Sequence, residues 1–386
     1  MANFTGKLGK NKILFSEVVG ALYNMIINQT VESRTIGSGM ASLIDEASRE
    51  VGLYGDRILK YFTDMLRVYD YEPDTTDQLN VLTTYRPPVP ICQEMVVDTA
   101  RYIPLTLDSY LSKNGFSDSQ TFGSFESVMS DWLRNTKKVY LAKEYNVFVG
   151  TTVATGGEQS VEVLLTNLDG LTTEVEKEAA SRRNAQLIAE AVANTMVAMT
   201  EDASRDYNDL GIEACYDKED LLMVWNAEEL NKITLVDLPT MYNDNEVLGA
   251  LKQNIRRLPA KYFGQANNPT GTNDITANGS RNFRFMHQTV VGGKVYQAGD
   301  VIPAGTKVYT GATKTLDIPY YDEIAHPVLV KIIHKDAAPV LAGFETTTEF
   351  WNPKNLSRND YLHFLYNSFD RFTGYPWVSV WYDPAG

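Results

Sequence analysis

The longest regular pattern of apolar positions lies in the middle of the chain, between Ser124 and Val149. Apolar side chains recur there at steps of three and four residues, which gathers them on one side of a helix and leaves Asp131, Asn135 and Lys138 on the other. Ser124 is the predicted N-cap, and Gly150 ends the pattern. At ~1.5 Å per residue such a helix is about 35 to 40 Å long. We therefore predict a spine helix that spans a whole domain.

Other helical patterns flank this one. Between Met40 and Leu66 the apolar positions keep helical spacing, with a break at residues 52–55, which predicts two short core helices. Thr173 opens a second long, alanine-rich helix, and Glu176 stands where a capping box requires it. A further helix is predicted over residues 246–258.

Extended patterns dominate residues 67–112, which are rich in β-branched and aromatic side chains. Prolines occur throughout this stretch, and because proline cannot donate to a strand ladder they exclude it from the centre of a sheet. We predict a long two-stranded arm that projects from the body. Since an isolated hairpin is marginal in water, we expect the arm to lie on another subunit.

The second half of the chain alternates between strand and turn signals. Strands are predicted at Leu221–Trp225 and Ile233–Val236, and alternation returns in residues 327–381. Residues 265–316 contain Gly, Thr and Asn turns between hairpin-like pieces, which predicts a small β insertion.

Charge and cysteine content exclude some functional classes. The formal net charge of -14 disfavours a surface that grips nucleic-acid phosphates. Cys92 and Cys215 are too few for a disulfide framework and do not form a zinc-binding spacing, so we interpret both as packing thiols in a reducing compartment. The start of the chain resembles a signal peptide, but Glu17 interrupts its apolar stretch. No run of residues is long and apolar enough for a membrane helix.

Candidate chemistry is sparse. His326 and His334 lie eight residues apart and could share a strand face as metal ligands, but ordinary histidines are the expectation. Residues 267–271, Asn-Asn-Pro-Thr-Gly, match a short string of pyridoxal-phosphate enzymes without the surrounding strand-helix alternation. Three acidic pairs could supply a general acid and base but are typical of solvated surface: Asp206/Asp209, Glu228/Glu229 and Asp322/Glu323. We assign no catalytic, cofactor-binding or metal residue, and no cofactor.

Several short segments, in this order, resemble the major capsid proteins of tailed bacteriophages, which have the Hong Kong 97-type fold. Among these, the chain is most similar to the major head protein of small short-tailed (podovirus) phages. The segments are residues 27–31 (INQTV), residues 125–127 (FES), residues 220–238 (DLLMVWNAEELNKITLVDL) and the aromatic-rich residues 344–380 with Asn352-Pro353. Residues 265–316 depart from the family pattern.

The resemblance implies an α+β fold with a definite division of the chain. Residues 1–39 would be an N-terminal arm and 67–112 an extended loop over a neighbouring subunit. The peripheral domain would take residues 40–66, 113–149 with the spine helix, and 327–386. The axial domain would take residues 150–326, with the β insertion at 265–316.

The same resemblance implies a non-enzymatic structural protein. It would form pentamers and hexamers, which contact one another through residues 67–112 and 1–39, in an icosahedral or prolate head around double-stranded DNA. Expected partners are a separate scaffolding protein, a portal protein and non-specifically held DNA, with no membrane. Assembly would take place in the host bacterial cytoplasm. Two alternatives stay open: an encapsulin-like compartment shell that holds enzymes, and an enzyme with an unrecognised site in a deep pocket of titratable groups.

Overall fold

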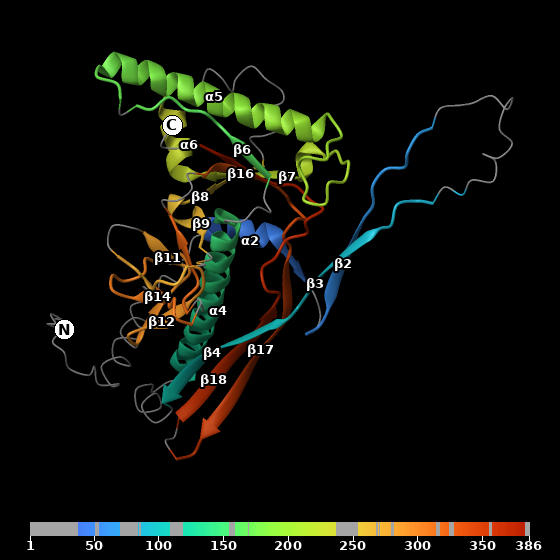
Figure 1. The fold of residues 1–386 in the computed structure, drawn as a ribbon. Helices are drawn as coiled ribbons and strands as arrows, with labels where there is room; N and C mark the ends of the chain where they lie inside the picture. Colours follow the sequence, from blue (N-terminus) through green and yellow to red (C-terminus); the bar gives the residue numbers. More distant parts are fainter. Residues whose placement is uncertain are drawn as a thin grey trace.

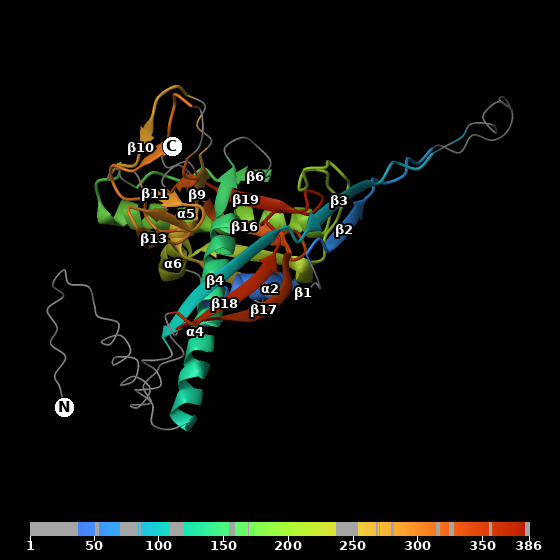
Figure 2. The same cartoon turned by 90° about the horizontal axis from the view of Figure 1, so that it is seen from below.

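The computed structural model describes residues 38–50, 54–69, 84, 86–108, 119–153, 159–168, 170–236, 254–267, 269, 271–278, 282–313, 317–323, 328–354 and 357–382. The predicted N-terminal arm therefore lies outside the described residues, except for its last two positions. Helices and strands are interspersed, as expected for an α+β fold (Figures 1 and 2). The described helical segments are η1 (Ser38–Ala41), α2 (Ser42–Ala47), α4 (Ser119–Gly150), α5 (Glu174–Thr200), η3 (Lys218–Asp220), α6 (Ala227–Val236) and η5 (Ala260–Tyr262).

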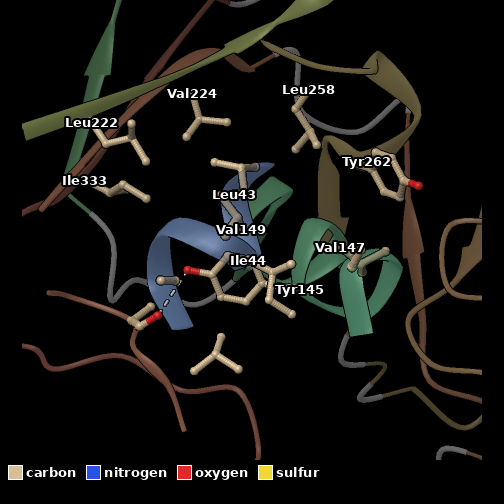
Figure 3. Packing of buried hydrophobic residues seen from close by; sticks show 14 of the residues in the cluster. Leu43, Ile44, Tyr145, Val147, Val149, Leu222, Val224, Leu258, Tyr262 and Ile333 are labelled. Atoms are coloured by element: carbon tan, nitrogen blue, oxygen red, sulfur yellow. Dashed lines mark hydrogen bonds between the residues drawn. The ribbon is translucent and has the colours of Figure 1, made fainter. Parts of the chain in front are cut away.

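Helix α4 is the predicted spine. It has 32 residues and begins at Ser119, so the predicted N-cap at Ser124 is wrong. Met129 and Leu133 of the predicted stripe are buried, whereas Trp132 is 55% exposed. The last turns are buried in a cluster in which Tyr145 and Val149 pack with α2 and with the next sheet (Figure 3). The helix ends at Gly150, where a Cβ would lie 2.7 Å from the carbonyl carbon of Tyr262.

A five-stranded sheet lies at this end of α4. Its order is β6 (Gln159–Glu162), β19 (Trp377–Trp381), β16 (Val328–His334), β7 (Leu221–Asn226) and β8 (Ile255–Leu258). Side chains of β7 alternate between the cluster under α5 and the cluster around α2 and α4. Both faces of the strand are therefore covered, which explains why Leu221–Trp225 is apolar at every position.

A longer sheet lies along α4, in the order β1 (Ser48–Glu50), β17 (Val340–Asn352), β18 (Ser357–Tyr366) and β4 (Thr99–Asp108). Strand β4 pairs with β18 without interruption from Thr99 to Asp108. Pro104 is tolerated because β4 is an edge strand, in agreement with the exclusion of these prolines from a sheet centre.

The predicted β insertion consists of small sheets around its own apolar cluster, which includes Phe283, Phe285 and Ile302. The hairpin of β12 and β13 turns at Gly292 and Gly293, both with positive φ, as the glycine pair predicts. The strands of this region and its flanks are β5 (Thr151–Val153), β9 (Gly264–Ala266), β10 (Ile275–Thr276), β11 (Phe283–Phe285), β12 (Thr289–Val291), β13 (Lys294–Tyr296), β14 (Lys307–Tyr309) and β15 (Tyr320–Asp322). Because β9 and β11 both pair with β15, the insertion is joined to residues beyond 316.

Three element predictions are wrong. Residues 57–62, expected in a helix, form strand β2 (Arg57–Phe62), which pairs with β3 (Ile91–Val96). Residues 233–236, expected as a strand, are the end of α6. Residues 255–258, expected at the end of a helix, form β8, and the earlier part of that predicted helix lies largely outside the described residues.

Two predicted boundaries also differ from the strand pairing. Among the described residues of the predicted loop 67–112, β3 belongs to the projecting arm, while β4 belongs to the long sheet. Within residues 327–386, β17 and β18 lie in the long sheet beside α4, whereas β16 pairs with β7 and β19 pairs with β6 in the five-stranded sheet. In both cases the strand pairs with a partner that is distant in sequence, and this pairing, rather than the local pattern, decides which sheet it joins.

Candidate assembly surfaces

Strands β2 and β3 form a ribbon that projects away from the body in both views (Figures 1 and 2). Six residue pairs hold it, from Arg57 opposite Val96 to Phe62 opposite Ile91. Side chains alternate between the two faces of strand β2. Ile58, Lys60 and Phe62 therefore face the body, and Leu59 and Tyr61 are more exposed.

The root of the ribbon is held by the turn before β19. The rings of Phe62 and Tyr375 meet edge to face, with centroids 5.3 Å apart. Gln93 of β3 donates to Thr373 Oγ1 and accepts from the backbone N–H of Thr373 at 2.9 Å. The ribbon therefore leaves the body at a fixed place, held by packing and by paired hydrogen bonds.

Charged groups complete this root. Asp336 accepts from Arg49 at 2.9 Å and lies 3.5 Å from Lys60 Nζ. Burial alone would raise the pKa of Asp336, but the hydrogen bond from Arg49 and the charge of Lys60 lower it. His334 stacks on Tyr375 with centroids 4.3 Å apart, and its Nδ1 accepts from the backbone N–H of Asp336. Burial lowers the pKa of His334, which favours the neutral ring that this hydrogen bond needs.

Beyond the paired strands, the ribbon exposes large apolar side chains. Leu66 is 70% exposed, Val68 91% and Val89 85%. These fractions are close to those of an unfolded chain, so folding of one copy gains little from them. Large apolar side chains exposed to this degree are typical of a protein-protein interface.

The face of the long sheet that points away from α4 carries a second group of exposed aromatic side chains. Tyr102 is 61% exposed and contacts Tyr361 and His363, each with centroids 5.9 Å away. Phe344 and Phe350 of β17 are 51% and 60% exposed. This aromatic face is a second surface suited to a partner.

The β insertion is fixed to α4 by consecutive residues. Lys143 Nζ lies 3.6 Å from Asp300. Glu144, which is 5% exposed, accepts from the backbone N–H of Gln288 at 2.8 Å and lies 2.6 Å from Nδ1 of His287. The hydrogen bond to Glu144 raises the pKa of His287 and outweighs its partial burial. The insertion and the spine helix are therefore joined by one partly buried ion pair and by the buried carboxylate of Glu144.

Two hollows run beside α4. A cavity of about 790 Å³ lies between α4, β4 and the insertion. In its lining Glu144 pairs with His287, and Arg371 pairs with Asp209 at 2.7 Å. A groove of about 500 Å³ lies between α2, α4 and the long sheet, where residues of β1, β17 and β18 line it. Three cations line this groove, Arg134, Lys137 and Lys138.

The residues considered for chemistry do not form a catalytic or metal constellation in the described part of the chain. His326 and parts of residues 267–271 lie outside it, and His334 is occupied at the ribbon root. Asp209 pairs with Arg371, and Glu323 pairs with Arg284 at 2.7 Å. Among the described residues, no group of three or more His, Cys, Asp or Glu side chains could hold a metal.

Both cysteines are exposed, so the prediction of packing thiols is wrong. Cys92 lies on the ribbon opposite Tyr61, and Cys215 donates to the carbonyl of Thr200 at 3.2 Å. None of the helices in the described ranges is long and apolar enough to cross a membrane. Sequence reasoning also missed the cationic groove, because its parts come from elements distant in sequence.

Comparison with protein families matches residues 1–368 to the model of the Phi29-like phage major capsid protein. No curated protein matches the chain. Among solved structures, it is similar to a chain in the capsid structure of Staphylococcus phage Andhra, at 11% identity and a TM-score of 0.57, over 88% of this chain and 83% of that chain.

A chain in the structure of the head fiber and inner core protein gp22 of native bacteriophage P68 is also similar. Its identity is 11% and its TM-score 0.54, over 98% of this chain and 92% of that chain. At this identity the likeness concerns the fold alone. The predicted Hong Kong 97-type fold is confirmed.

Proposed function

Because the chain belongs to the family of Phi29-like phage major capsid proteins, we propose that it assembles with copies of itself into pentamers and hexamers of a phage head. The projecting ribbon is the observation that carries this proposal. Its outer residues are too exposed to stabilise a single copy, and they would become buried only against a neighbour. Each contact is modest, but a closed shell repeats it many times, so that its contribution is multivalent.

The division of the chain follows as part of the proposal. Residues 1–39 act as an arm toward neighbours. The extended loop corresponds to the ribbon between β2 and β3, which moves its boundaries from 67–112 to about 57–96. The peripheral domain contains α4 and the long sheet, and the axial domain contains the five-stranded sheet with α5 and α6.

We further propose that the shell encloses double-stranded DNA without gripping it. The formal net charge of -14 supports this, because an acidic subunit gains little from phosphate contacts. A separate scaffolding protein and a portal protein are the proposed partners of assembly in the host cytoplasm. A purely structural role, without catalysis, agrees with the ion pairs of Glu144 and Arg371 in the lining of the larger cavity.

A truncated ribbon tests the role of the loop. Replacement of residues 66–88 by a short Gly/Ser linker keeps β2, β3 and the contact of Asp64 with Arg205. We expect a folded, soluble subunit that forms no closed shells when it is co-expressed with its scaffold and observed by negative-stain electron microscopy.

The variant Leu66→Ser/Val68→Ser/Val89→Ser should also reduce the formation of closed shells, as the truncation does. Val175→Ser is the matched control, because Val175 is also exposed, at 77%, but lies on α5. Normal shells from the truncated chain would refute the proposed role of the ribbon.

A further inference from the structure

We propose that the cavity between α4, β4 and the insertion binds a small aromatic carboxylate, with the charged group of the ligand at Arg101 and its rings along an aromatic wall that ends at Trp377. The site belongs to a single copy, and its ligand is a free small molecule. The inference therefore goes beyond the proposed function and does not depend on any contact between copies.

The cavity lies where three parts of the fold meet. Helix α4 lies between the insertion and the long sheet (Figure 1), and residues of all three line the cavity together with the turn that follows β18. Its volume of about 790 Å³ is within the range of ~300–1,000 Å³ that is typical of small-molecule sites. Arg101 in the lining is exposed, and the side chain of His287 is 60% exposed. The cavity is therefore open to a ligand from solution.

Arg101 supplies a cation that no carboxylate of its surroundings neutralises. Its guanidinium donates to the hydroxyl oxygens of Tyr366 and Tyr140, and these contacts raise the pKa of Arg101. Burial raises the pKa of Tyr140, so that its hydroxyl is neutral. Among the described residues, no Asp or Glu lies within ion-pair distance of Arg101. Arg101 therefore faces the cavity fully charged and without a counter-ion.

The hydrogen bonds around Arg101 leave donors in excess. The hydroxyl oxygens of Tyr140 and Tyr366 lie 2.9 Å apart, so one hydroxyl donates to the other and the proton of the second remains for another acceptor. A guanidinium also has more N–H donors than these two oxygens can accept. A carboxylate accepts at both of its oxygens, and its hydrogen bonds to a guanidinium are charge-assisted. A ligand carboxylate thus supplies the acceptors that this end of the cavity lacks.

The two carboxylates in the cavity lining do not compensate Arg101. Glu144 lies 2.6 Å from His287 Nδ1 and accepts from the backbone N–H of Gln288. The hydrogen bond to Glu144 raises the pKa of His287, while the nearby charge of Arg101 lowers it. Asp370, the second carboxylate, accepts from the backbone N–H of the next residue. The charge of Arg101 therefore remains available to a ligand.

An unbroken series of aromatic rings lines the cavity from the Arg101 end. Successive ring centroids are 5.7 to 6.2 Å apart. In order, the rings belong to Tyr140, Phe364, Tyr366, Phe369, Phe148 and Trp377. Aromatic rings favour one another in offset and edge-to-face contacts at about 4.5–7 Å between centroids. This wall therefore favours an aromatic body on the ligand, in line with the carboxylate at Arg101.

The direct test measures binding of 2-naphthoate to the full-length chain by isothermal titration calorimetry. The matched probe is 2-naphthamide, which has the same rings and no charge. We expect 2-naphthoate to bind at least about fivefold more tightly, because only its carboxylate forms charge-assisted hydrogen bonds. Arg101→Gln should weaken binding of 2-naphthoate roughly tenfold and change binding of 2-naphthamide less than about twofold. Arg183→Gln, at an exposed position of α5, is the control and should change neither affinity.

A second variant tests where the rings of the ligand lie. Thr136 of α4 is exposed at the cavity, and its hydroxyl donates to the carbonyl of Trp132 in the same helix at 2.8 Å. Thr136→Trp should therefore fill the cavity without disturbing the core, and both probes should bind at least about fivefold more weakly. Ser130→Trp is the control, because Ser130 is exposed on the same helix and does not line the cavity. Far-UV circular dichroism checks that both variants are folded.

Three results would overturn the inference: no detectable binding of 2-naphthoate, equal affinity for the two probes, or unchanged affinity for 2-naphthoate in Arg101→Gln or Thr136→Trp. All of these measurements use the chain without its scaffold, so none of them depends on shell formation. Failure here leaves the proposed function untouched, and failure of the truncated ribbon to block shells leaves this site untouched.

Discussion

Gly374 lies at the ribbon root, where the structure leaves no room for a side chain. A Cβ built on Gly374 would lie 2.6 Å from Cγ of Phe62 and closer still to two further ring atoms. The backbone of Gly374 is not in the left-handed region, so alanine is excluded by the ring rather than by conformation. The variant Gly374→Ala therefore pushes Phe62, and with it strand β2, away from the body.

The expected cost follows from what Phe62 would lose. Overpacking of this kind costs about 1–3 kcal/mol. Displacing the ring also weakens its edge-to-face contact with Tyr375, which is worth roughly 0.5–1.5 kcal/mol. Alanine recovers about 0.4–1 kcal/mol through the unfolded chain. We expect a net decrease of about 1–3 kcal/mol in the free energy of unfolding, since Phe62 is only partly buried and can shift somewhat.

Urea unfolding followed by far-UV circular dichroism measures this free energy. The control is Gly170→Ala, because a Cβ at Gly170 meets nothing within 4 Å. A second comparison uses Phe62→Ala, which removes the ring that causes the clash. In that background Gly374→Ala should be neutral or slightly stabilising, which makes the two substitutions strongly coupled.

Independent, additive effects of the two substitutions would refute this account of the ribbon root. So would an unchanged free energy of unfolding in the Gly374→Ala single variant, because the ring would then move without cost.

The remaining predictions concern α5 and His334. Thr173→Ala removes the side chain that caps α5 and should cost about 0.5–2 kcal/mol in urea unfolding, whereas the exposed neighbour Thr172→Ala should have little effect. The pKa of His334 is lower in the folded chain than in the unfolded chain, so the unfolded chain binds a proton there first as the pH falls. The free energy of unfolding should therefore decrease below about pH 6.5. The decrease should be up to ~1.4 kcal/mol per pH unit until the pH reaches the folded pKa. Asp220 and Asp336 oppose this lowering, and Lys60 and Lys335 add to it. Thermal unfolding of His334→Asn between about pH 7.5 and 5 should show a smaller loss than the unmodified chain, and an equal loss would contradict the assignment.

Local chemistry made some of the fold predictable. Thr173 and Glu176 form the capping box of α5 as their spacing predicts, and Gly292-Gly293 turn the β12–β13 hairpin. These features depend on residues within a few positions of each other, so the sequence contains the whole interaction. The spine helix was predictable for the same reason, except that its first turns extend beyond the apolar stripe.

Features that depend on distant partners were not predictable in this way. Ile58, Leu59 and Phe62 fit a helical period as well as a strand, and only pairing with residues 91–96 decides between them. In the sequence, Arg134 and Lys138 are typical of an ordinary solvated helix face. Only the fold, which packs α2 and β17 beside them, shows that they line a groove. Val175 is an apolar residue of the first turn of α5, but it is exposed because the apolar cluster beneath the helix begins only at Ala185.

The chain passes from the five-stranded sheet to the long sheet between β16 and β17, and it returns between β18 and β19. A third connection runs from β4 of the long sheet through α4 to β6 of the five-stranded sheet. Three covalent connections therefore join the sheets, and tension that separates them is shared among all three. A proteolytic nick in one crossing would leave the other two intact, so the cut subunit should stay in one piece. The second crossing also carries the turn that holds the ribbon, so a load on the ribbon is passed directly into the connection between the sheets.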